Sequence, residues 1–159
     1  MTPEQAAALM TYASAFDNRN VTAEAATAWA DTLAPYVNLH DGRRAVSDHY
    51  ATTSDWIMPA HINRAVKRYR AARIAEAPYG DVPPELDPAQ TQAWLTTYRR
   101  ALGDGNTVNA AHQAADHAHN ITRPPEIEPN PERVTQLIDH VRNQIPTPPT
   151  SQEQPDDAA

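Results

Sequence analysis

The stretch TTSDWIMPAHINRAVKRYRAAR, residues 52–73, combines a helix start with a concentration of positive charge. Pro59 follows a short run that we expect to be extended, and proline is favoured at the first position of a helix. At 100° per residue, a helix from Pro59 has one apolar face and a broad basic face opposite to it. The stretch therefore predicts an amphipathic helix whose outer face is basic. The apolar face comprises Ile62, Ala65, Val66, Tyr69 and Ala72; the basic face comprises Arg64, Lys67, Arg68 and Arg70, and Arg73 falls near the apolar stripe.

This basic face is unexpected because the chain is acidic, with 13 Lys and Arg residues against 20 Asp and Glu residues and a net charge of −7. Residues 1–77 hold eight acidic and eight basic side chains, so the whole net charge falls in residues 78–159. A charged outer helix face is usually only solvated, and that is the favoured interpretation. The alternative is a contact with nucleic acid or with a protein partner.

Helix signals also fill the residues before this stretch. Thr2-Pro3-Glu4-Gln5 has the order of an N-cap, a first-turn proline and a glutamine that reaches back to the cap, which predicts a helix to about Phe16. Thr22 can cap a second helix, which Pro35 should end or kink, and Asp41-Gly42 should open a third. Strand signals are absent throughout, so the predicted fold class is all-α.

We expect residues 1–77 to form an N-terminal helical domain with a single core, and apolar side chains at helical spacing define that core. Alanine makes up much of the apolar content, so the larger side chains carry most of the packing. The residues predicted to converge there are Trp29, Leu33, Val46, Tyr50, Trp56, Ile62, Val66 and Tyr69.

Proline and glycine divide the rest of the chain. Residues 78–86 have the composition of a linker. Asp87 and Thr107 can each cap a helix, and glycines at 103 and 105 stop the first of them, which predicts a helical hairpin over residues 87–120. A second linker over 121–130 precedes an amphipathic helix at 131–145, and the tail 146–159 has too few apolar residues to order itself. The apolar face of the last helix comprises Val134, Leu137, Ile138, Val141 and Ile145.

Several function classes have no signal in the sequence. There is no cysteine for a disulfide or a thiolate metal site, and no apolar run approaches the length of a membrane span. The phosphate loop of nucleotide hydrolases is missing, and the consecutive residues Ser47-Asp48-His49 cannot converge as a catalytic triad on a helix. We therefore expect a soluble intracellular protein that is not an enzyme and needs no cofactor.

One group of side chains resembles a metal site. His112, Asp116 and His119 share one face of the predicted hairpin's second helix. No fourth ligand is indicated and the HExxH arrangement is missing, so a solvated or loosely packed face is the favoured interpretation. We expect no metal.

Residues 5 to about 74 resemble the N-terminal helical domain of the small phage replicative-helicase loaders and inhibitors that lack an ATPase domain. The resemblance rests on spacing, and the helix bounds near Pro35 and Ala60-His61 depart from it. The hairpin at 87–120 lies outside it. The matching residues are Tyr12, Phe16, Thr22, Glu24, Trp29, Leu33, Ala45, Val46, His49, Tyr50, Trp56, Pro59 and Ile62.

The resemblance implies an accessory protein of phage DNA replication, in the cytoplasm of the bacterial host. Such a protein would bind the hexameric replicative helicase, restrain it and deliver it to an origin complex. The apolar face of the helix at 131–145 would suit docking in a groove of the helicase, although it could equally pack on its own domain or pair with itself. The basic face would meet helicase, an origin-binding initiator or DNA. The alternatives are a small helical DNA-binding regulator or packaging protein, and a virion assembly protein.

Overall fold

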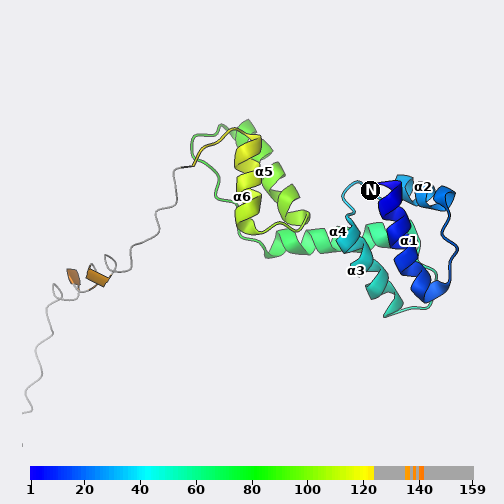
Figure 1. Cartoon of the computed structure of the whole chain (residues 1–159). Helices are drawn as coiled ribbons and strands as arrows, with labels where there is room; N and C mark the ends of the chain where they lie inside the picture. Colours follow the sequence, from blue (N-terminus) through cyan, green and yellow to red (C-terminus); the bar gives the residue numbers. More distant parts are fainter. Residues whose placement is uncertain (124–134, 137, 139, 142–159) are drawn as a thin grey trace, which may run out of the picture. The chain divides into compact units, whose positions relative to one another are not determined.

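The structure, a computed structural model, describes residues 1–123 together with residues 135, 136, 138, 140 and 141. Within these residues the fold is all-α, as predicted, and contains no strand. None of the described helices is long and apolar enough to cross a membrane. The helices, labelled in Figure 1, are α1 Pro3–Asp17, α2 Ala23–Thr32, α3 Leu39–Tyr50, α4 Pro59–Glu76, α5 Pro88–Gly103 and α6 Val108–Ala118.

Side-chain caps explain where most of the helices begin. The hydroxyl oxygens of Thr2, Thr22 and Thr107 and the carboxylate of Asp87 each accept a hydrogen bond from a backbone N–H in the first turn. These caps satisfy donors that have no partner inside the helix. All four were predicted from the sequence.

The start of α3 differs from the prediction, which placed it at Asp41-Gly42. The helix begins at Leu39, because the Asn38 side chain accepts from the Asp41 N–H at 2.8 Å and caps it. Asp41 and Gly42 are buried in its first turn. A Cβ on Gly42 would lie 3.0 Å from Leu9, so the glycine lets α3 pack closely on α1.

Helix α2 ends before Pro35, and hydrogen bonds link this end to α4. The Asn63 side chain accepts from the Ala34 N–H at 2.8 Å and donates to the Thr32 carbonyl at 3.1 Å. One α4 residue thus satisfies backbone groups that the end of a helix leaves open.

The first core lies among α1 to α4, and most of its predicted members are confirmed. Trp56 is the exception, because it is 60% exposed while its neighbour Ile57 is fully buried. Successive side chains of an extended segment point to opposite sides, so only one of the two can face the core. Ala72, predicted on the apolar face of α4, is exposed. The larger buried side chains are Leu9, Met10, Trp29, Leu33, Val37, Val46, Ile57, Ile62 and Val66.

The second core lies between α5 and α6, which run side by side in Figure 1. Residues 78–86, predicted as a linker, pack against it through Val82 and Leu86. Gly80 is buried, and a Cβ there would lie 2.7 Å from Trp94. The segment is therefore part of the hairpin's packing. Buried members of this core are Trp94, Leu95, Tyr98, Ala101, Leu102, Ala111 and Ala115.

Helix α4 joins the two cores within one compact unit, Met1–Thr122. Its first half packs in the first core, and Ile74 near its end packs against the second. Arg73 donates to both carboxylate oxygens of Asp41 in α3 and, at 2.8 Å, to the carbonyl of Gly103 in α5. Arg70 pairs with Asp104 just beyond α5.

Residues Arg123–Ala159 form a separate unit. Ile138 and Val141 are helical there, and they are 57% and 51% exposed. Val134, Leu137 and Ile145, the other residues of the predicted docking face, lie outside the residues that the structure describes.

Candidate functional site

An open cleft of about 170 Å³ lies between helices α3 and α4. Ala45 and Ala65 are both buried in its lining, and their small side chains leave room between the helices. The remaining lining is polar. It comprises Asp48, His49 and Thr52 from the end of α3 and just beyond it, and His61, Arg64 and Arg68 from α4.

The basic side chains within residues 52–73 form two groups. Arg64, Lys67 and Arg68 are exposed, and Arg64 and Arg68 line the cleft one helical turn apart. Arg70 and Arg73 are engaged with acidic partners in ion pairs. The predicted basic face therefore loses Arg70, whose guanidinium also lies over the Tyr36 ring at 5.3 Å.

Asp48 is the acidic member of the cleft lining. Its carboxylate accepts a 2.6 Å hydrogen bond from the Tyr69 hydroxyl, and Arg44 approaches it at 3.8 Å. Burial, with the hydrogen bond to Asp48, raises the pKa of Tyr69 to about 12, so this hydroxyl stays protonated as a donor at neutral pH. The negative charge of Asp48 is thus partly compensated, and the two arginines leave the cleft cationic.

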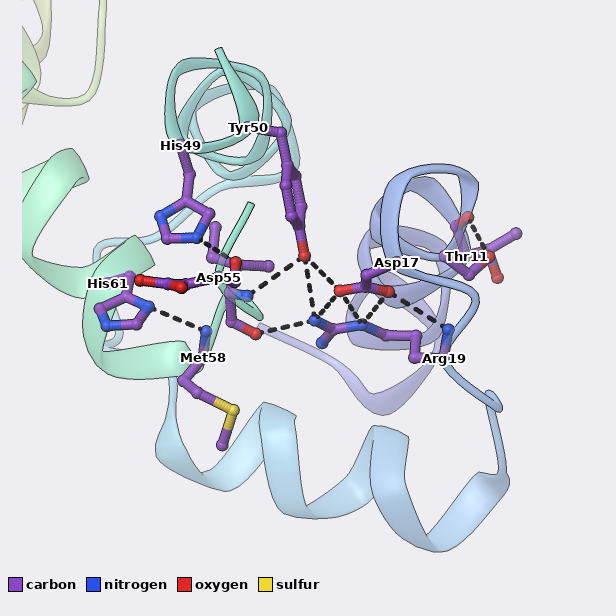
Figure 2. Close-up of polar contacts among 10 residues, drawn as sticks. Thr11, Asp17, Arg19, His49, Tyr50, Asp55, Met58 and His61 are labelled. Carbon is purple, nitrogen blue, oxygen red and sulfur yellow. Dashed lines mark hydrogen bonds and ion pairs between the residues drawn. The ribbon is translucent and has the colours of Figure 1, made fainter. Parts of the chain in front are cut away.

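The two histidines of the cleft hold the chain segment that precedes α4. The His49 Nε2–H donates to the Asp55 carbonyl at 2.7 Å, and His61 Nδ1 accepts from the Met58 N–H at 3.1 Å. These contacts are drawn in Figure 2. Because His61 Nδ1 is an acceptor, its proton lies on Nε2, which remains a donor. The rings stack with centroids 5.1 Å apart.

A second polar network holds the same segment from its other side. Arg19 donates to Asp17 and, at 2.8 Å, to the Ile57 carbonyl, while the Tyr50 hydroxyl donates to Asp17 and accepts from the Ile57 N–H (Figure 2). The Arg19 and Asp17 side chains are only 6% and 3% exposed. The hydrogen bonds from Arg19 lower the pKa of Asp17 to about 2, against an ordinary value of 3.8. The carboxylate is charged at neutral pH and matches the buried guanidinium.

Between these two anchors, the segment presents Trp56 and Met58 to solvent. They are 60% and 51% exposed. The Arg19 guanidinium lies 5.6 Å from the Trp56 ring centroid. Phe16, 50% exposed, stacks on Tyr50 with ring centroids 4.9 Å apart. The segment that the cleft histidines hold therefore carries two exposed apolar side chains, one of them aromatic.

The structure does not bring together the side chains of Ser47, Asp48 and His49. Ser47 meets the Tyr12 hydroxyl at 2.8 Å, whereas Asp48 and His49 bond to Tyr69 and Asp55. This divergence is the one expected for consecutive helical residues. The side chains have no nucleophile and base geometry.

The residues that resembled a metal site are used in packing of the hairpin. His112 stacks on Tyr98 with centroids 4.7 Å apart and accepts from the Asp81 N–H, and buried Asp116 accepts from the Trp94 indole at 2.8 Å. His119 Nε2 lies 3.4 Å from the Thr97 hydroxyl. Among the described residues, no group of three or more His, Cys, Asp or Glu side chains is placed to hold a metal ion.

Neither anchor of residues 55–58 was predicted from the sequence. His61 follows the cap residue Met58 by three positions, and Gln5 follows the cap residue Thr2 by the same spacing. This spacing, typical of a capping box, was a local signal for the role of His61. Arg19 and Tyr50 are far apart in sequence, and no local pattern joins them.

No protein-family model, curated protein or solved structure matches this chain. The geometry and the spacing pattern of residues 5–74 are therefore the observations from which a function can be argued.

Proposed function

We propose that the chain is a non-catalytic accessory protein of phage DNA replication that binds the hexameric replicative helicase, restrains it and delivers it to an origin complex. The supporting observation is the role of the residues that carry the resemblance to the loader family. Trp29, Leu33, Val46 and Ile62 belong to one buried core, and Thr22 caps α2. The matching pattern thus corresponds to a folded helical domain.

The division of the chain fits a partner held at two points. Met1–Thr122 has its own cores and an exposed cationic cleft, and Arg123–Ala159 is a separate unit in which Ile138 and Val141 are exposed. Apolar side chains three residues apart on a helix suit docking in an apolar groove. Two linked contacts strengthen each other through effective concentration. We assign attachment to the second unit and a further contact to the cleft.

Truncation after Pro124 tests this assignment. The truncated chain keeps all residues of both cores, so its circular dichroism and thermal transition should match those of Met1–Thr122 in the full chain. We expect its affinity for the helicase to fall about tenfold or more. Equal binding by the truncated and full chains would refute the assignment of attachment to the second unit.

Charge reversal in the cleft should have a different effect. Arg64→Glu with Arg68→Glu should leave the contact made by the second unit intact and impair delivery or inhibition, measured as helicase-dependent unwinding of an origin substrate. Arg99→Glu with Arg100→Glu makes the same charge change on exposed positions of α5 and is the matched control. Impairment by both pairs would show a general charge effect and contradict a role for the cleft.

A further inference from the structure

The cleft between α3 and α4 has the chemistry of a phosphate site. Arg64 and Arg68 offer planar guanidinium groups, and guanidinium can bind phosphate with two parallel hydrogen bonds. His61 keeps Nε2–H as a further donor. Several donors around one small space suit the oxygens of a phosphate better than the two oxygens of a carboxylate. The volume of about 170 Å³ is suited to one such group.

An exposed aromatic side chain on the segment that the cleft histidines hold indicates which molecule carries that phosphate. Residues 55–58 are tied to the cleft through His49 and His61, and Trp56 of the same segment is 60% exposed. Proteins that bind single-stranded nucleic acid combine a cationic groove with exposed aromatic rings. The groove takes the backbone and the ring stacks on an unpaired base.

We propose that this cleft binds a backbone phosphate of single-stranded nucleic acid while a neighbouring base stacks on Trp56. This function goes beyond helicase binding and does not depend on it. Duplex DNA is disfavoured, because its bases are already stacked on one another and paired, so none is free to stack on Trp56. An acidic peptide could pair with the two arginines, but its binding would not require a contact with the Trp56 indole.

The test is fluorescence anisotropy of a labelled oligodeoxythymidylate of about 12 nucleotides with the purified full chain and no helicase. We expect saturable, salt-dependent binding. Arg64→Ala with Arg68→Ala should weaken it about tenfold or more and reduce the slope of log affinity against log salt by about 0.7 for each lost phosphate contact. Trp56→Ala should weaken binding about fivefold or more, and Trp56→Phe should restore part of the loss.

Arg99→Ala with Arg100→Ala removes the same charge from exposed positions of α5 and should leave the affinity within about twofold of that of the unaltered chain. An equal loss of affinity in the two double-arginine variants would rule out the cleft as the binding site. An absence of binding by the full chain would rule it out as well. Tighter binding of a duplex of the same sequence, or of a poly-glutamate peptide, would overturn the choice of ligand. Helicase binding by the cleft variants is measured separately, so either proposal can fail while the other stands.

Discussion

Arg73 of α4 pairs with both carboxylate oxygens of Asp41 in α3, and the Asp41 side chain is fully buried. The same guanidinium donates to the Gly103 carbonyl at 2.8 Å. This arginine therefore holds together three helices that are distant in sequence. Two of the five basic side chains in residues 52–73, Arg70 and Arg73, are therefore engaged in ion pairs, and the exposed three are the part available to a ligand.

Replacement of Arg73 should strongly destabilise the fold. Arg73→Ala leaves the buried Asp41 carboxylate without its ion-pair partner, and we expect the free energy of unfolding to fall by about 3 to 5 kcal/mol. Arg64→Ala, at an exposed position of the same helix, should change it by less than about 0.5 kcal/mol. Urea denaturation measures both. Similar values for the two variants would contradict the structural role of Arg73.

Acid should destabilise the fold in a defined range. Hydrogen bonds from Arg19 lower the pKa of Asp17 from 3.8 to about 2, and those from Arg73 lower the pKa of Asp41. A lowered carboxylate pKa in the folded state adds stability that is complete above the unfolded pKa and is lost as pH falls toward the folded pKa. For Asp17 this amounts to roughly 2 kcal/mol, lost between about pH 4 and pH 2.

The control for this pH dependence is Asp17→Asn. This variant should be less stable at pH 7, because the buried Arg19 loses its counter-ion, and it should lose less stability between about pH 4 and pH 2. Thermal denaturation at a series of pH values checks both effects. The same pH profile in the variant and the unaltered chain would exclude Asp17 as a source of acid sensitivity.

Two tryptophans should respond differently to truncation. Trp29 is 8% exposed within the first core, so Trp29→Ala should cost about 3 to 5 kcal/mol. Trp56 is 60% exposed, so Trp56→Ala should cost less than about 1 kcal/mol. The midpoints of thermal unfolding give the comparison. A larger loss for Trp56 would mean that its ring is buried in solution.

Gly80 tests whether residues 78–86 belong to the hairpin. A Cβ there would lie 2.7 Å from Trp94 and 3.0 Å from Tyr98, so Gly80→Ala should destabilise the chain by about 1 to 3 kcal/mol through overpacking. Tyr79→Ala changes a neighbouring side chain that is 73% exposed and should have little effect. If Gly80→Ala unfolds at the same urea concentration as the unaltered chain, the segment does not pack as described.

Local signals in the sequence were enough to predict most helix positions. Thr2, Thr22, Asp87 and Thr107 cap the helices for which their spacing predicted them, and Pro59 begins α4. Each of these signals acts within a few residues of chain. Caps and first-turn prolines can therefore be identified without knowledge of the tertiary structure.

The errors arose where contacts distant in sequence decide the outcome. Which of Trp56 and Ile57 faces the core depends on Arg19 and Tyr50, which hold the Ile57 backbone. The cleft was missed for a similar reason. Its basic side chains were visible as a helix face, but His49 comes from another helix and no sequence period relates it to them.

We propose that this chain binds a hexameric replicative helicase, and a mixture of the two purified proteins tests this proposal. The measurement is size-exclusion chromatography with light scattering on the purified full chain mixed with a purified hexameric replicative helicase, taken from a bacterial host or from a phage. We expect a complex whose mass exceeds that of the hexamer by a whole number of copies of the chain. Two separate species at concentrations well above micromolar, with either source of helicase, would contradict it.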